Sequence, residues 1–228
     1  HCKKGGIAAI YENGYITIKK GDWKFRVEKA TLIPLTFGGK VTFMIYNVLA
    51  ATLASYVYGF KIEDIATSLG TFIPSAAQTP GRMNIFTFKD FKVMIDFAHN
   101  PDGFNGIKEF LSTIDSPDKI GIITGTGDRR DSDIRELGRI SAQMFDHIII
   151  RQDKFLRGRE ADDIVKLLVE GIKEIDPKQS YEYIPKEVDA LKHALSLAKP
   201  GTFITALSDV IDNAIDIVQT YLDKESGL

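Results

Sequence analysis

The sequence predicts an α/β protein in which a smaller region of β-hairpins and helices is followed by a Rossmann-like domain with a mostly parallel sheet. Two patterns carry this prediction. Up to residue 37, β-forming runs alternate with short turns, and Asn13-Gly14 is a dipeptide typical of a tight hairpin. From residue 84 onward, short apolar runs alternate with amphipathic segments at helical spacing, as in a parallel sheet whose strands are joined by helices.

The first region is predicted to hold three strands and two helices. The strands are expected at 6–10, 15–19 and 23–27, and the helices at 41–60 and 62–69. The segment 74–82 is rich in turn-forming residues and is typical of a linker. We therefore place a domain boundary near Met83, which gives domains 1–83 and 84–228.

The second region is predicted to alternate strand, loop and helix. Strands are expected at 93–97, 119–124, 147–151, 181–184 and 202–207, and the helices that follow them begin near residues 104, 132, 161, 187 and 209. In such a sheet, ligands bind outside the carboxyl ends of the strands, so the loops at these ends are the first place to look for a site.

Composition excludes several classes of protein. The chain of 228 residues is 44% hydrophobic and carries a net charge of -2, which argues against a broad nucleic-acid surface. A single cysteine, Cys2, excludes an internal disulfide framework and is compatible with the cytoplasm. No apolar run approaches the roughly 20 residues that cross a bilayer, so no membrane partner is expected. The sequence starts at His1 rather than Met, and we expect it to be a fragment of a longer protein.

Three polar loops follow predicted strands. In the first, Asp96 ends an apolar run and precedes His99 and Asn100, and a carboxylate in that position needs hydrogen-bonding partners. The second, residues 125–131, places glycines before a predicted helix, a favourable position for an anion, and then Asp128, Arg129, Arg130 and Asp131. The third contains Asp153, Lys154, Arg157, Arg159 and Glu160, and its two arginines can clamp a phosphate or carboxylate. Each loop can equally be a solvated turn without function.

Motif searches narrow the alternatives. The second loop lacks the third glycine of G-x-G-x-x-G, because Arg130 stands in that position, and no Walker A sequence occurs in the chain. An unrelated Rossmann-type oxidoreductase or methyltransferase is therefore disfavoured. There is no Cys/His cluster for zinc, and His147 and His193 are expected to be structural.

Three motifs in order resemble the downstream half of the Mur ligase family, whose members form amide bonds in the synthesis of peptidoglycan precursors, folylpolyglutamate and cyanophycin. These motifs are Tyr46–Ala51, Pro80–Arg82 and Asp96–Pro101. The segments 33–39, 80–84, 127–131 and 157–159 most resemble the Mur-like carboxyl-terminal half of the cyanophycin synthetase branch. The peptidoglycan ligases commonly carry His-Asn where this chain has Phe43-Met44, which also favours the cyanophycin branch.

The resemblance implies a reaction. ATP and Mg²⁺ activate a substrate carboxylate as an acyl phosphate, and an amine then attacks it. In the cyanophycin branch the expected amine is arginine, and the acceptor is the aspartate side-chain carboxylate of an acidic polymer backbone. The sequence leaves open whether copies of the chain form a homo-oligomer.

The resemblance also implies residue roles. Asn47 is expected to contact adenine, Arg82 to reach the ATP phosphates, and Asp96, with His99 and Asn100 beside it, to lie at the ribose or hinge. The residues expected to handle the amino-acid substrate are Asp128, Arg129, Arg130, Asp131, Asp153, Arg157 and Arg159. An arginine substrate would require carboxylates, and Asp128, Asp131, Asp153 and Glu160 are candidates.

The family's P-loop and magnesium ligands have no counterpart in these 228 residues. Without a P-loop nothing positions the γ-phosphate and the metal, so we expect the metal ligands upstream and the isolated chain to be inactive. Two alternatives stay open: a fragment of a peptidoglycan-precursor or folylpolyglutamate-type Mur ligase, and a non-catalytic module that binds a nucleotide or an amino acid.

Overall fold

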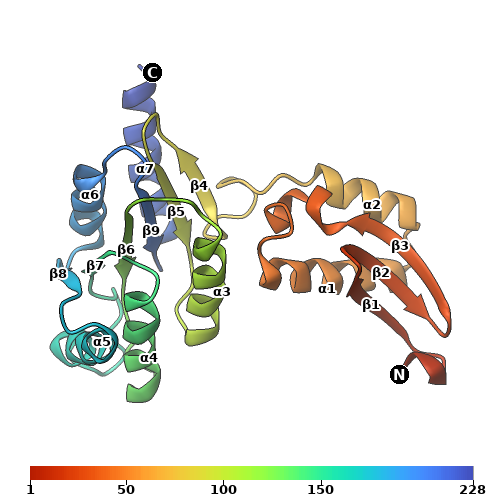
Figure 1. The fold of residues 1–228 in the computed structure, drawn as a ribbon, viewed down its shortest axis with the longest axis horizontal. Helices are drawn as coiled ribbons and strands as arrows, with labels where there is room; N and C mark the ends of the chain where they lie inside the picture. The colour runs from red at the N-terminus through yellow and green to blue at the C-terminus, as the bar shows by residue number, and fades with distance from the viewer. Residues whose placement is uncertain (228) are drawn as a thin grey trace. The chain divides into compact units, whose positions relative to one another are not determined.

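The computed structural model describes residues 1–227 and divides into two compact units, His1–Pro74 (unit 1) and Ser75–Leu228 (unit 2). Figure 1 shows the elements of each unit. The predicted boundary near Met83 falls inside unit 2. The reason is that the turn before Met83 is hydrogen-bonded into that unit: the Phe97 amide donates to the Gly81 carbonyl at 2.9 Å, and the Gly81 amide donates to Asn84 Oδ1 at 2.7 Å.

Unit 1 consists of an antiparallel sheet and two helices. Its strands are β1 (Ile7–Glu12), β2 (Tyr15–Lys20) and β3 (Trp23–Lys29), in the order β1-β2-β3. Asn13 and Gly14 both have positive φ in the predicted hairpin turn. Short 3₁₀ turns at Cys2–Lys4, Ala30–Leu32 and Pro34–Thr36 flank the sheet, and α1 (Thr42–Tyr58) and α2 (Ile62–Thr71) complete the unit. Its core joins the sheet to both helices through Ile16, Ile18, Val48 and Ile65.

Unit 2 is a six-stranded α/β sheet. Its elements are β4 (Asn84–Thr87), β5 (Lys92–Asp96), α3 (Pro101–Ser112), β6 (Lys119–Ile123), α4 (Asp131–Ala142), β7 (His147–Ile150), α5 (Ala161–Ile175), β8 (Ser180–Tyr183), α6 (Glu187–Leu197), β9 (Phe203–Leu207) and α7 (Ile211–Ser226). The strand order is β4-β5-β9-β6-β7-β8, and only β4 is antiparallel to its neighbour. The predicted mostly parallel sheet is thus confirmed, whereas β4 was not predicted.

Helices cover both faces of this sheet (Figure 1). Helices α6 and α7 pack on one face, where Ala190 and Val218 join a core with Ile95, Ile122 and Ile204 of the central strands. Helices α3, α4 and α5 lie side by side in the other layer. The central strands β5, β9, β6 and β7 are buried almost throughout, which is why they appear in the sequence as continuous apolar runs. No helix within residues 1–227 is long and apolar enough to cross a membrane.

Candidate active site

The parallel strands of unit 2 end at a common edge. Asp96 is paired with Leu207 across β5 and β9, and Ile123 with Ile150 across β6 and β7. The loops that leave these strands therefore lie at the same edge of the sheet. The structure thus places Asp96, the loop with Asp128–Asp131 and the loop with Arg157–Arg159 on one side of the domain.

Asp96 occupies a buried position at the end of β5, where it is only 6% exposed. Its Oδ2 accepts a hydrogen bond from the Met83 amide at 2.9 Å, and its Oδ1 accepts from the Ala98 amide at 2.8 Å. Burial raises the pKa of Asp96, and the two amides and the nearby Arg82 partly oppose that rise. Both carboxylate oxygens are therefore engaged in holding backbone, and Asp96 fits a positioning role at the hinge better than direct contact with a sugar.

Arg82 lies exposed beside this anchored turn. Its guanidinium carbon is 5.4 Å from the centroid of the Phe97 ring, and the one hydrogen bond described for its side chain within residues 1–227 is a long one, 3.5 Å, to the Gly81 carbonyl. Met83, the next residue, has a φ of 49°, a conformation that the bond to Asp96 helps to hold. Arg82 therefore presents an unpaired guanidinium of the kind that stabilises phosphoryl charge.

His99 and Asn100 follow β5 and have local partners. His99 Nδ1 lies 3.0 Å from the Phe97 carbonyl oxygen, and its ring meets the Phe97 ring edge-on. Asn100 is the N-cap of α3, with its Oδ1 accepting from the Gly103 amide at 2.8 Å. The amide nitrogen of Asn100 remains available for a ligand, whereas its oxygen is committed to the helix.

The two charged loops are bound to each other by two ion pairs. Arg157 Nη1 lies 2.6 Å from Asp128 Oδ2, and Arg159 Nη1 lies 2.6 Å from Asp131 Oδ1. Arg159 also donates to the carbonyls of Gly127, at 3.2 Å, and Arg129, at 3.0 Å. These guanidinium groups hold the pKa of both Asp128 and Asp131 below the ordinary range.

This pairing changes the interpretation of the predicted residues. Asp128 and Asp131 were expected to be available to an arginine substrate, but both carboxylates already pair with arginines of the neighbouring loop. Arg130 turns to the surface and pairs with Asp133 of α4 at 3.0 Å. The Nε of Arg129 is buried and has no described partner within residues 1–227, so Arg129 remains a candidate for binding a substrate group.

Glycines bring the two loops and their helices into close contact. A Cβ on Gly127 would lie 1.9 Å from the Leu156 carbonyl oxygen. Helices α4 and α5, which follow the two loops, also meet through glycines: a Cβ on Gly138 would lie 2.2 Å from the Leu168 carbonyl oxygen, and one on Gly171 would lie 2.0 Å from that of Arg135. No side chain larger than hydrogen fits at these three positions without moving backbone.

A buried ionic cluster lies behind the third loop, and sequence analysis identified only one of its members, Asp153. At its centre is Arg151, which is 2% exposed and bonds to Asp209 Oδ1 at 2.5 Å and to the Leu207 carbonyl at 3.2 Å. Glu187 lies 3.7 Å from the Arg151 guanidinium and accepts a hydrogen bond from the Ser208 hydroxyl. Arg151 could have been identified by the pattern that identified Asp96, because each is an ionisable residue at the end of an apolar strand.

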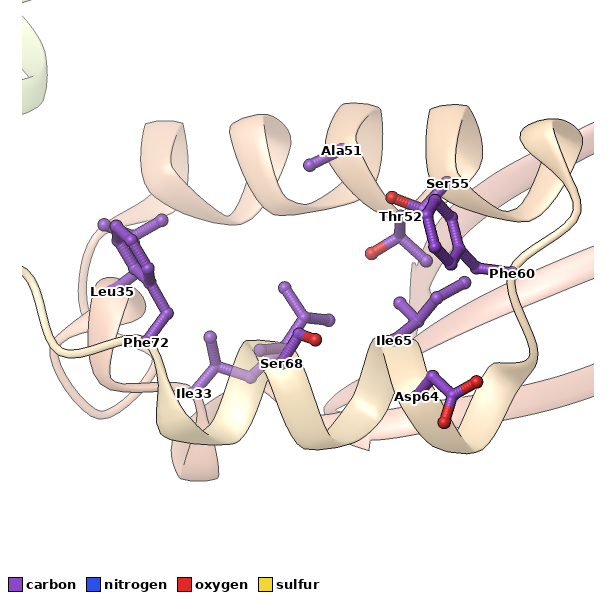
Figure 2. Close-up of a pocket in the computed structure, with 11 residues that line it drawn as sticks. Ile33, Leu35, Ala51, Thr52, Ser55, Phe60, Asp64, Ile65, Ser68 and Phe72 are labelled. Carbon is purple, nitrogen blue, oxygen red and sulfur yellow. The ribbon is translucent and has the colours of Figure 1, made fainter.

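Asn47 belongs to unit 1 and lies on α1 with its side chain exposed; its amide is 3.7 Å from the Met44 sulfur. The same unit has a cavity of about 560 Å³ between α1 and α2. Figure 2 shows Phe72 and Leu35 at one end of this cavity and Phe60 at the other. Asn47 does not line it, and among the described residues that do, Asp64 is the one that carries a charge.

Comparison with known proteins agrees with the fold. The profile of the "Mur ligase, glutamate ligase domain" matches residues 81–209. Cyanophycin synthetase from Nostoc sp. strain PCC 7120 is 42% identical over 219 residues, which are 96% of this chain and 24% of that protein. The UDP-N-acetylmuramoyl-L-alanyl-D-glutamate--2,6-diaminopimelate ligase of Caldanaerobacter subterraneus is 31% identical over 185 residues, 79% of this chain and 36% of that enzyme.

Solved structures share the fold at lower identity. Escherichia coli FolC in complex with DHPP and ADP has a TM-score of 0.65 at 16% identity, with 92% of this chain and 45% of that chain covered. Mycobacterium tuberculosis folylpolyglutamate synthase complexed with ADP and AMPPCP has a TM-score of 0.66 at 18% identity, with 92% and 47% covered. The chain spans about a quarter of the length of the curated cyanophycin synthetases that it matches. The profile of the Mur ligase glutamate ligase domain matches more than half of its residues. We conclude that the chain belongs to the Mur ligase family.

Proposed function

We propose that this chain is the carboxyl-terminal, Mur-like part of a cyanophycin synthetase, an ATP-dependent ligase that joins arginine to aspartate side chains of an acidic polymer in the cytoplasm. The observation that carries the proposal is the 42% identity to cyanophycin synthetases over 96% of the chain. On this reading, unit 1 is the end of the family's central ATPase domain and unit 2 is its carboxyl-terminal domain.

The proposed reaction has two steps. The aspartate carboxylate attacks the γ-phosphate of ATP, which releases ADP and forms an acyl phosphate. The arginine amine then attacks the acyl carbon, phosphate leaves with the bonding electron pair, and the amine loses a proton to form the amide. Mg²⁺, bound by residues outside this chain, would neutralise charge on the phosphates.

The residues of unit 2 support three roles in these steps. The exposed Arg82 guanidinium suits the transferring phosphoryl group, with Asp96 holding its turn in place. His99 and the free amide of Asn100 lie next to that turn in sequence and suit the nucleotide. Arg129, whose Nε has no described partner within residues 1–227, suits the carboxylate of the incoming amino acid, and Asp153 suits a cationic side chain. Arg157 and Arg159 hold the two charged loops together through their ion pairs with Asp128 and Asp131.

The test uses the full-length gene product with ATP, Mg²⁺, L-arginine and a poly-aspartate primer. We expect phosphate release and a mass gain of one arginine per modified aspartate, and the 228-residue chain alone should show neither. Arg82→Ala should lower kcat at least about a hundredfold, because removing one donor to the transition state costs that much. Lys92→Ala is the matched control, since Lys92 is an exposed cation at the opposite end of β5.

Substrate panels separate the alternatives. Turnover of a UDP-muramoyl peptide or a folate in place of the acidic polymer would replace the proposal with a peptidoglycan or folylpolyglutamate ligase. Binding of ATP and arginine without turnover by the full-length product would favour a non-catalytic module.

A further inference from the structure

The turn that carries Arg82 is held on both sides by one buried side-chain amide, that of Asn84. Asn84 is 4% exposed; its Oδ1 accepts a hydrogen bond from the Gly81 amide at 2.7 Å, and its Nδ2 donates to the Thr79 carbonyl at 3.0 Å. The same Thr79 carbonyl also accepts from the Arg82 amide at 3.1 Å. Asn84 therefore links the peptide groups on which the position of Arg82 depends.

The backbone on either side of Arg82 has a conformation that requires such support. Gly81 has a φ of 69° and Met83 a φ of 49°, so both lie in the left-handed region. A residue other than glycine keeps this conformation only where the surrounding structure holds it. Gly81 and Met83 are buried, whereas Arg82 between them is exposed. Buried, strained backbone that presents one exposed cation is typical of a site that positions a side chain for a ligand.

Close packing leaves the turn little room to shift. A Cβ at Gly81 would lie 2.7 Å from Cδ1 of Ile211 in α7, and the Gly81 carbonyl accepts a hydrogen bond from the Phe97 amide at 2.9 Å. The guanidinium of Arg82 lies over the ring of the same Phe97. The contacts with Ile211, Phe97 and Asn84 therefore fix the backbone of the turn, and the Phe97 ring supports the guanidinium.

We propose that Asn84 is a positioning residue for the ligase reaction and that it acts through Arg82. Its two hydrogen bonds hold the turn so that the Arg82 guanidinium meets the transferring phosphoryl group, and their loss lets the guanidinium move out of place. The role requires a side chain that accepts from Gly81 and donates to Thr79 at the same time, and a primary amide does both. This inference rests on the proposed function, because it uses the role given there to Arg82.

The experiment is a double-mutant cycle in the full-length gene product, in which kcat and the KM for L-arginine are measured. Asn84→Ala should lower kcat about tenfold to a hundredfold, because a displacement of about 1 Å in a catalytic group costs that much. In an Arg82→Ala background the same substitution should change kcat by less than about twofold, since the residue through which Asn84 acts is then absent. The KM for L-arginine should be unchanged in every variant.

Thr202→Ala is the matched control for a purely structural effect. Thr202 is 1% exposed and also holds a turn through two hydrogen bonds, one accepted from the Lys199 amide at 3.0 Å and one donated to Asp118 Oδ2 at 3.1 Å. It precedes β9 and therefore lies at the opposite end of the sheet from Arg82. Thr202→Ala should lower the temperature of thermal unfolding, as Asn84→Ala does, but should leave kcat unchanged at temperatures where both variants are folded.

Asn84→Asp is the second variant, used if Asn84→Ala does not fold, because a carboxylate keeps the acceptor for the Gly81 amide and loses only the donor to Thr79. It should lower kcat when Arg82 is present and leave it unchanged in the Arg82→Ala background. If the Asn84 substitution lowers kcat by the same factor in both backgrounds, or leaves it unchanged as Thr202→Ala does, the positioning role is refuted while the ligase proposal stands. If the wild-type product shows no turnover, or Arg82→Ala turns over like the wild type, the role of Arg82 fails and this inference fails with it.

Discussion

Replacing Asp96 with alanine tests whether a single carboxylate anchors the turn that carries Arg82. The change removes the acceptor of the Met83 amide, at 2.9 Å, and of the Ala98 amide, at 2.8 Å. Each buried donor left without a partner costs about 1–3 kcal/mol. Because burial raises the pKa of Asp96, removing the carboxyl group also relieves some desolvation. We therefore expect unit 2 to lose about 2–4 kcal/mol of unfolding free energy.

Denaturant titration followed by circular dichroism measures this loss, and hydrogen exchange locates it. The amides of Met83 and Ala98 should exchange much faster in Asp96→Ala, and Asp96→Asn should show a smaller effect, because its amide keeps one acceptor oxygen. Asp90→Ala is the control, since Asp90 is exposed in the turn between β4 and β5 and its side chain has no described bond. Equal stabilities of Asp96→Ala and Asp90→Ala, with unchanged exchange at both amides, would refute the reasoning.

Three further outcomes are expected. Gly127→Ala should disrupt the contact between the two charged loops, because a Cβ at residue 127 would lie 1.9 Å from the Leu156 carbonyl oxygen. The backbone amides of both loops should then exchange faster, and unchanged exchange would contradict the close approach of residue 127 to Leu156. Asn100→Ala should cost about 0.5–2 kcal/mol through the lost cap of α3, whereas Asn100→Asp should keep most of the stability in thermal unfolding. Burial raises the pKa of Glu187, so the folded state holds that proton more tightly and the unfolding free energy should fall as pH rises through the folded pKa. Glu187→Gln should remove this part of the slope in urea titrations carried from the ordinary pKa of a glutamate upward, and an unchanged slope would contradict it.

Local patterns in the sequence were sufficient for most of the fold. The alternation of apolar runs and amphipathic segments predicted every parallel strand of unit 2, and Asp96 was identified because a carboxylate at the end of a buried strand needs partners. Strand β4 was missed because it has only four residues and is antiparallel to β5 at the edge of the sheet. No helix connects it to β5, so the strand–helix alternation that predicted the other strands does not include it.

The ion pairs between the loops could not be predicted from the sequence. Sequence analysis identified Asp128, Asp131, Arg157 and Arg159 but treated them as available to substrate, because their mutual ion pairs join residues in separate loops. The Arg151 cluster was missed for the same reason. Its bond to Asp209 joins residues that are 58 positions apart in the sequence, and nothing near Arg151 in the chain indicates that partner.

The glycine contact between α4 and α5 makes the spacing of the two charged loops a property of the helix pair. Arg135–Glu170 and Arg139–Glu174 tie the same helices along their surface, but only the bare backbones at Gly138 and Gly171 allow the axes to approach this closely. A methyl group at either position would push α4 and α5 apart and would thereby move the charged loops that precede them. The spacing of the two charged loops is therefore set in part at Gly138 and Gly171, within the helices, and a substitution there would change it without altering a polar side chain.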